Sequence, residues 1–290
     1  MKKLLTWCVF LLMVILQGND ISNRQKFFRT VHKQPSAAAN FLQDPDPEIR
    51  RYALFLVIEN YPEKAALPIE RALGDTYETV RLTATAALAK KIDLHPQGMK
   101  LLQKIALQDK SQQIREIAVA ATWPFHRQIK LLRNDPTWDY EVKVQEVIPL
   151  EKLPWRFITD PLQEGHLKNY FHPDADTSRW LPIKMGAWET QGFADYNGVA
   201  WYQIKFTMPE KIDSNAVEVH FDAVDESTWV WMNGVYLGKH DKGPEGWQEP
   251  FAMDCTKEIR WGKENTLTVR VYDAAYAGGI YKPLRIEILK

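Results

Sequence analysis

The sequence Thr228-Trp229-Val230-Trp231-Met232-Asn233-Gly234-Val235-Tyr236-Leu237 gives the clearest indication of the fold of the second half of the chain. Residues 228–232 are β-branched, aromatic or apolar, which favours a strand. Asn233 and Gly234 both tolerate positive φ, and they predict a two-residue hairpin turn. We therefore expect an antiparallel β-hairpin here.

Alternation of apolar and polar residues predicts more strands on both sides of this hairpin. The alternation is clearest over residues 140–147, as on a half-buried strand. Similar runs occupy residues 200–206, 216–221, 266–272 and 284–289. Many short strands joined by turns predict a β-sandwich or jelly roll.

The strand region also resembles a known family. The motifs that carry the resemblance are, in order, Gly198-Val199-Ala200-Trp201-Tyr202-Gln203-Ile204-Lys205-Phe206, Phe221-Asp222-Ala223-Val224-Asp225, Val230-Trp231-Met232-Asn233-Gly234-Val235-Tyr236-Leu237-Gly238-Lys239-His240, Pro250-Phe251 with Asp254-Cys255-Thr256, Asn265-Thr266-Leu267-Thr268-Val269-Arg270-Val271 and Gly278-Gly279-Ile280-Tyr281-Lys282-Pro283. They are similar to the N-terminal sugar-binding domain of family 2 glycoside hydrolases such as β-galactosidases and β-glucuronidases. The resemblance implies a galactose-binding-like jelly roll over residues 137–290.

Catalytic activity does not follow from this resemblance. In that family the catalytic glutamates lie on a separate barrel of roughly 250 residues, whereas this sequence ends at Lys290 directly after the predicted sandwich. Asp225 and Glu226 are adjacent carboxylates, but adjacent strand residues point to opposite faces, so we interpret the pair as part of a solvated turn. The sequence shows no Gly-rich phosphate loop, metal-type His pair or activated Ser or Cys. We therefore expect no catalytic residues.

A sugar site in the sandwich would need a flat aromatic ring to stack on a pyranose, and carboxylates, amides or His to bind its hydroxyls. Such sites usually lie in the loops at one end of a sandwich. The loop residues of these types, which we predict to bind glycan, are Trp188, Glu189, Asp195, Tyr196, Asn197, His240, Asp241, Trp247, Glu249, Asp273, Tyr276 and Tyr281. Two alternatives to ligand contact remain open. The loop aromatics would instead pack beneath the loops, and His240 would instead make structural hydrogen bonds.

Other positions of the sandwich have plainer interpretations. Trp201, Trp229 and Trp231 lie within predicted strands, and we interpret them as core or sheet-face residues. Related sandwiches sometimes hold a structural calcium ion through loop oxygens, and such an ion is conceivable here, although no spacing specifies one. We expect no other cofactor. Cys255 would be the one cysteine left after removal of an N-terminal signal, so no internal disulfide is expected.

The first half of the chain carries a repeat of the form apolar-Arg-x-x-Ala. It recurs at Ile49-Arg50-Arg51-Tyr52-Ala53, Val80-Arg81-Leu82-Thr83-Ala84 and Ile114-Arg115-Glu116-Ile117-Ala118. The small Ala allows helices to approach closely, and residues 65–73 and 97–106 supply second helices. An Asp precedes each repeat, at Asp44, Asp75 and Asp109, where a helix cap is needed.

These repeats resemble HEAT repeats, whose helix pairs stack into a short α-solenoid, over about residues 24–135. The resemblance implies that each repeat Arg bonds an Asp of the neighbouring repeat, and that the stack is a scaffold or a protein-docking surface. Trp123-Pro124-Phe125 breaks the third repeat, because Pro lacks a backbone donor and disfavours a helix before it. The predicted fold class is thus a multidomain one, a HEAT-like α-solenoid followed by a galactose-binding-like β-sandwich.

The N-terminus has the pattern of a secretory signal. Lys2 and Lys3 precede an apolar stretch over residues 4–16, which is shorter than the roughly 20 residues of a membrane-spanning helix. We therefore predict a signal peptide over residues 1–19 and an exported protein, in the periplasm, on the cell surface or secreted. No membrane span is expected after its removal, although an uncleaved anchor stays open and the cleavage site is poorly marked.

Charge and composition limit the function classes. The 37 basic and 37 acidic side chains cancel, so no global field would attract nucleic acid. Aromatic residues concentrate toward the C-terminal part of the chain, since ten of the 11 Trp lie at or beyond Trp123. We predict a non-catalytic exported module whose sandwich binds glycan and whose repeats dock a protein partner. The alternatives are a purely structural or protein-interaction protein and, least favoured, a divergent glycosidase or hydrolase accessory subunit.

Overall fold

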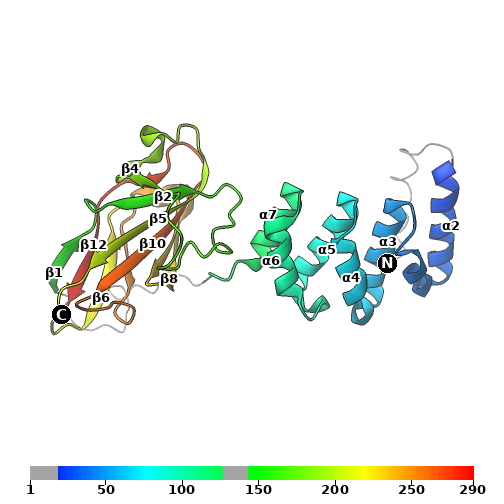
Figure 1. Cartoon of the computed structure of the whole chain (residues 1–290), viewed down its shortest axis with the longest axis horizontal. Helices are drawn as coiled ribbons and strands as arrows, with labels where there is room; N and C mark the ends of the chain where they lie inside the picture. Colours follow the sequence, from blue (N-terminus) through cyan, green and yellow to red (C-terminus); the bar gives the residue numbers. More distant parts are fainter. Residues whose placement is uncertain (1–18, 127–142) are drawn as a thin grey trace. The chain divides into compact units, whose positions relative to one another are not determined.

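The structure, a computed structural model, describes residues 19–126 and 143–290, with side chains from Ser22 onward. The chain divides into two compact units between Thr122 and Trp123. The first unit is helical and the second consists mainly of strands (Figure 1). The predicted signal segment and the first residues of the predicted strand over 140–147 lie outside the described residues.

The helical unit is a stack of short helices. Their bounds are α2 (Asn19–Lys33), α3 (Pro47–Asn60), α4 (Ala66–Leu73), α5 (Glu78–Lys90), α6 (Gly98–Gln108) and α7 (Gln112–Thr122), with 3-10 turns η1 (Pro35–Phe41), η2 (Pro62–Lys64) and η3 (Ile92–Leu94). Helices α3, α5 and α7 pack side by side, while α4 packs on α5 and α6 on α7 (Figure 1). Ala53, Ala84 and Ala118, the small residue of each repeat, have no exposed surface, which confirms the close helix approach.

An Arg–Asp ladder joins consecutive repeats. Arg50 donates from Nε and Nη2 to the carboxylate of Asp75 at 2.8 and 2.9 Å, and Arg81 binds Asp109 in the same way at 2.8 and 3.1 Å. Each Asp also accepts from a backbone amide two residues further on, Asp75 from Tyr77 and Asp109 from Ser111, just before the next helix. Helix α5 starts after Tyr77 without a side-chain cap bond, so the cap predicted for Asp75 is not formed. The predicted pairing is therefore confirmed for these two arginines.

The ends of the ladder differ from its middle. Arg24, which the repeat pattern did not single out, forms an additional pair with Asp46. Arg115 donates to the backbone carbonyl of Asp109 at 2.8 Å. The ladder thus begins one repeat earlier than the sequence pattern indicated.

The second unit is a β-sandwich. One sheet has the order β1-β12-β6-β9, the other the order β3-β2-β5-β10-β7-β8, and β11 pairs with β4. The strands are β1 (Val144–Pro149), β2 (Trp155–Thr159), β3 (Leu181–Ile183), β4 (Gly186–Ala187), β5 (Gly198–Thr207), β6 (Ala216–Phe221), β7 (Ser227–Met232), β8 (Val235–Asp241), β9 (Phe251–Asp254), β10 (Glu264–Asp273), β11 (Gly279–Ile280) and β12 (Leu284–Leu289). The predicted strands within the described residues are all present, and β2, β3, β4, β8, β9 and β11 join them.

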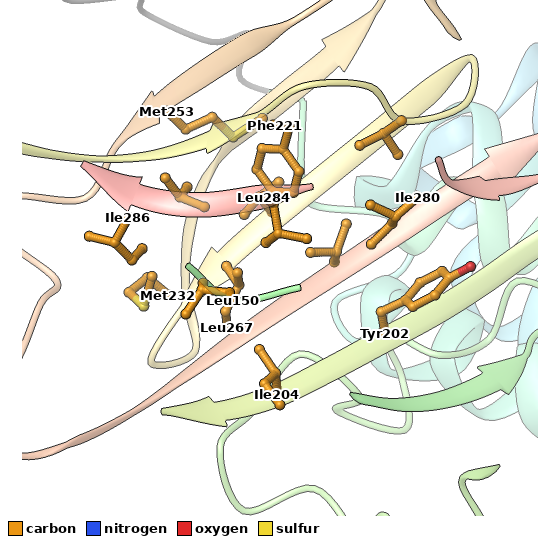
Figure 2. Packing of buried hydrophobic residues seen from close by; sticks show 14 of the residues in the cluster. Leu150, Tyr202, Ile204, Phe221, Met232, Met253, Leu267, Ile280, Leu284 and Ile286 are labelled. Atoms are coloured by element: carbon orange, nitrogen blue, oxygen red, sulfur yellow. The ribbon is translucent and has the colours of Figure 1, made fainter. Parts of the chain in front are cut away.

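Inward-facing residues of both sheets form one apolar core. Leu150, Tyr202, Phe221, Leu267 and Ile286 are buried together in it (Figure 2). The hairpin between β7 and β8 has positive φ at Asn233 (54°) and Gly234 (83°), so the predicted turn is confirmed. The side chain of this Asn ties the turn to β10, since Thr266 N donates to its Oδ1 at 2.9 Å.

The outer face of the six-stranded sheet is also covered by aromatic residues. Trp201 and Trp231 are fully buried there, with ring centroids 5.2 Å apart, which confirms that the strand tryptophans are sheet-face residues. Trp123 and Phe125 pack against this face: the centroid of Phe125 lies 5.0 Å from that of Trp231, and Arg270 lies over the Trp123 ring at 4.6 Å. The second unit therefore starts at Trp123, whereas the sequence assigned these residues to the repeats.

Candidate functional site

The predicted binding loops meet at one end of the sandwich. Strand register places Gly198 of β5 opposite Asp273 of β10, and Ser227 of β7 opposite Asp241 of β8. Since Ser227 also lies beside Tyr272 of β10, these strand ends are neighbours. The segments 188–197, 222–226, 242–250 and 274–281 consequently extend from the same end of the sheet.

A pair of buried carboxyl groups lies at the base of these loops. Asp225 and Asp273 are 5% and 0% exposed, and Oδ2 of each is buried without a hydrogen-bond partner in the described part of the chain. Burial, together with the charge of Asp273, raises the pKa of Asp225 to about 8, and burial also raises the pKa of Asp273. Because two neighbouring buried carboxylates cannot both ionise cheaply, the raised pKa keeps Asp225 largely protonated at neutral pH. This corrects our interpretation of Asp225 as a residue in a solvated turn.

Two further carboxylates hold the loop after β10 in place. Glu226 Oε2 accepts from the amide of Ala274 at 2.9 Å, and Glu189 Oε1 accepts from the amide of Gly278 at 2.9 Å. Gly278 approaches Trp188 so closely that an added Cβ would lie 2.1 Å from the ring. Glu226 is partly exposed and can reach a ligand as well as the loop, whereas Oε2 of the partly exposed Glu189 is buried without a hydrogen-bond partner.

Aromatic side chains stand next to the carboxylates. Trp247 is 44% exposed, and its ring centroid lies 5.9 Å from that of the half-buried Tyr281, edge to face. Burial, followed by the charges of Asp225 and Asp273, holds the pKa of the Tyr281 hydroxyl well above its usual value. The exposed indole and the phenol provide the stacking surface that pyranose recognition needs.

Two of the predicted site residues belong to the core instead. Trp188 has no exposed surface and donates from Nε1 to the Tyr196 carbonyl at 3.0 Å. The Tyr196 ring packs on Trp188, its hydroxyl donates to the Val199 carbonyl, and burial raises its pKa to about 12. A ring without exposed surface cannot stack on a sugar, which corrects the prediction for Trp188.

The remaining predicted residues differ in exposure. His240 is 6% exposed and stacks on Phe251 with ring centroids 4.1 Å apart, and burial lowers its pKa, which keeps the imidazole neutral. Asp241 accepts from Ser227 Oγ at 2.9 Å and pairs with Lys239. His240 and Asp241 therefore support the base of the loops.

The predicted residues on the outer part of these loops are exposed. Asp195, Asn197, Glu249 and Tyr276 are all exposed, and Glu249 lies 3.8 Å from Lys242. Tyr276 is 95% exposed with a positive φ of 74°, which lifts its ring out of the loop surface. These side chains are available to a ligand but contact few groups of the protein.

Asp225 and Glu226 are the site residues that the sequence analysis missed. Asp225 and Asp273 are 48 positions apart in the chain, and only the fold brings them together. The sequence nevertheless indicated Asp225, because this ionisable residue directly follows the apolar residues Ala223 and Val224.

Within residues 19–126 and 143–290, no group of three or more His, Cys, Asp and Glu is arranged to hold a metal ion. A structural calcium ion stays a prediction.

Comparison with known proteins agrees with this two-part organisation. Residues 35–122 match HEAT repeats, and residues 167–281 match the family described as glycosyl hydrolases family 2, sugar binding domain. A β-galactosidase of Thermoanaerobacter pseudethanolicus is 31% identical over 110 residues, which cover 33% of this chain and 14% of that protein. A β-glucuronidase of Formosa agariphila is 32% identical over 76 residues, which cover 26% of this chain and 7% of that protein.

Solved structures of this family give similar matches over the sandwich. A family 2 glycosyl hydrolase of Bacteroides cellulosilyticus matches 49% of this chain and 20% of its own, with 22% identity and a TM-score of 0.41. The β-glucuronidase of Ruminococcus gnavus matches 51% of this chain and 29% of its own, with 15% identity and a TM-score of 0.44. The chain thus spans a small part of the relatives that it matches. Its residues 35–122 are thus similar to HEAT repeats, and its residues 167–281 are similar to the sugar-binding domain of family 2 glycosyl hydrolases.

Proposed function

We propose that this protein is a non-catalytic, exported carbohydrate-recognition module, in which the loop end of the sandwich binds glycan and the helical repeats dock a protein. The observation that carries the proposal is the exposed ring of Trp247 beside Tyr281, next to the carboxylates of Glu189 and Glu226. An aromatic platform with adjoining hydrogen-bond acceptors suits the apolar face and the hydroxyls of a pyranose.

Docking by the repeats is supported by a surface cavity of the helical unit. The cavity has a volume of about 430 Å³, and its lining includes Leu42, Pro45, Leu54, Pro68 and Arg71. Asp44, Asp75 and Arg50 also line it, so apolar walls with charged groups of both signs suit a peptide segment with apolar and polar side chains. Export is supported by the basic and apolar N-terminal pattern, and none of the helices in the described ranges is long and apolar enough to cross a membrane.

The proposal is tested by a glycan-array screen of the full chain, with a hydrolysis assay on chromogenic glycosides in parallel. We expect binding to a defined glycan class without turnover. Trp247→Ala should weaken that binding by about tenfold or more, because a stacking ring contributes on the order of 1–2 kcal/mol. The thermal midpoint should hardly change, since the side chain is exposed.

Tyr77→Ala is the matched control, because Tyr77 is a 52% exposed aromatic residue of the helical unit. It should leave glycan binding unchanged. Turnover by the wild-type chain would contradict the non-catalytic assignment. A blank array would favour the second candidate, a protein-interaction role for both units, which the burial of Trp188 among the predicted loop aromatics supports.

A further inference from the structure

Carboxylates gather at the loop end of the sandwich and act on one another. Besides burial and hydrogen bonds, the groups that act most strongly on Asp225 and Asp273 are carboxylates, namely each other, Glu189 and Glu226. The same four act on Tyr281. The lysines of the adjoining segment are engaged elsewhere, Lys239 with Asp241 and Lys242 with Glu249.

Several buried polar atoms at this end have no hydrogen-bond partner within the described part of the chain, among them Oδ2 of Asp225 and of Asp273. Glu189 Oε2 is buried without a hydrogen bond, while Oε1 of the same carboxylate binds the Gly278 amide. The hydroxyl of Tyr202, a residue with no exposed surface, also lacks a well-formed hydrogen bond; it lies on the Ile280 side of the core (Figure 2). Burial raises the pKa of Tyr202, and the charges of Glu189, Tyr281 and Asp225 add to this. Buried polar atoms without partners in a native protein call for a ligand, an ion or water.

We propose that this site selects a glycan with a free, protonated amino group over its N-acetylated form, and that it rejects glycans with a carboxylate. The inference rests on the proposed function, since it names the class of sugar that the same site takes. An ammonium group brings three hydrogen-bond donors and a positive charge, which match Glu189 and Glu226. A uronic acid would add a fifth carboxylate to those of Asp225, Asp273, Glu189 and Glu226, which would repel it.

Binding of the ammonium group would also move a proton. Asp225 and Asp273 lie at the base of the same loops, and burial raises the pKa of both carboxyl groups, that of Asp225 to about 8. A positive charge nearby favours the ionised form of Asp225, so its proton passes to the buffer when the amino sugar binds. No covalent bond forms or breaks in this step. Release of a proton on binding is therefore a signature of the amino sugar that its N-acetylated form lacks.

The experiment is isothermal titration calorimetry of the full chain near neutral pH with three probes: a β-linked glucosamine oligosaccharide, its N-acetylated form and a glucuronic acid oligosaccharide. We expect the glucosamine probe to bind about tenfold more tightly than the acetylated one, and the uronate not to bind. For the glucosamine probe alone, the heat should vary with the ionisation enthalpy of the buffer.

A conservative variant separates charge from structure. Glu189→Gln keeps an acceptor for the Gly278 amide but removes the charge, so the tenfold preference should be lost while the thermal midpoint is kept. Glu264→Gln is the control, because Glu264 pairs with Lys205 at the other end of β10. Equal or tighter binding of the acetylated or uronate probe would overturn this inference and leave glycan recognition standing. Failure of all three probes would overturn it too, and only a blank glycan array would remove the proposed function itself.

Discussion

Buried aspartates occur in both units, but the two units neutralise them in opposite ways. In the helical unit each of Asp75 and Asp109 faces an Arg of the preceding repeat, whereas in the sandwich Asp225 faces another carboxyl group. Burial alone would raise the pKa of Asp75, but hydrogen bonds from Arg50 and the Tyr77 amide outweigh it and lower the pKa. Burial and a like charge instead raise the pKa of Asp225 to about 8.

The two units should consequently respond to pH with opposite sign. The unfolded chain titrates an Asp near pH 3.8. A lowered folded pKa gives the helical unit stability that is present above that value and is lost as pH falls through the folded pKa. A raised folded pKa gives the sandwich stability that is complete below pH 3.8 and is lost as pH rises toward 8. Aspartates therefore stabilise the helical unit at higher pH and the sandwich at lower pH.

The largest expected effect comes from breaking the ladder. Asp109→Ala leaves Arg81 buried without its carboxylate and should lower the unfolding free energy of the helical unit by about 3 kcal/mol. Both side chains of this pair are 6% exposed. Urea unfolding followed by far-ultraviolet circular dichroism, which is dominated by helices, measures the change.

Asp46→Ala is the matched comparison at the end of the ladder. Asp46 also caps a helix and binds an Arg, but the pair is more exposed, at 12% and 14%. The loss should be about 1 kcal/mol. If the two variants lost equal stability, burial would not govern the strength of the ladder.

A second prediction tests where the boundary between the units lies. Trp123→Ala should lower the unfolding free energy of the sandwich by about 2 kcal/mol, because Trp123 is half-buried against Trp229 and stacks on Arg270. The helical transition should stay where it is. Tryptophan fluorescence reports the sandwich selectively, since no Trp lies between residues 8 and 122.

Leu107→Ala controls for the loss of an exposed apolar side chain, since Leu107 is 44% exposed on α6. Neither transition should move in this variant. If Trp123→Ala lowered the unfolding free energy of the helical unit alone, Trp123 would stabilise the repeats and not the sandwich.

The ease of prediction from sequence also differs between the units. The ladder was predictable because the repeats resemble HEAT repeats, and that resemblance implies a bond from each repeat Arg to an Asp of the neighbouring repeat. The sandwich strands were predictable from alternation and from the Asn233-Gly234 turn. The shape of the site was not, because Asp225 and Asp273 meet only through strand register. Trp188 shows the same limit. Its position in a predicted loop did not indicate that its ring would be buried against Gly278.

The smallest expected effect, for each pH unit, is the pH response of the carboxyl pair, and it tests the comparison most directly. Asp225→Asn resembles the protonated Asp and can donate to Asp273, so at pH 5 the variant and the wild-type sandwich should be about equally stable. For each pH unit between about 5 and 8 the wild type loses up to about 1 kcal/mol, because the folded protein keeps a proton that the unfolded chain has already given up near pH 3.8. The variant has no such loss, so its relative stability should rise with pH.

The measurement is the urea midpoint of the fluorescence transition at three pH values, with Asp241→Asn as control. Asp241 accepts from Ser227 and pairs with Lys239, and although burial opposes it, the hydrogen bond from Lys239 lowers its pKa. Its replacement should therefore destabilise the sandwich without any rise in relative stability toward pH 8. A pH-independent difference between Asp225→Asn and the wild type would mean that Asp225 holds no proton at neutral pH, and the sandwich would then neutralise its buried aspartates in some other way.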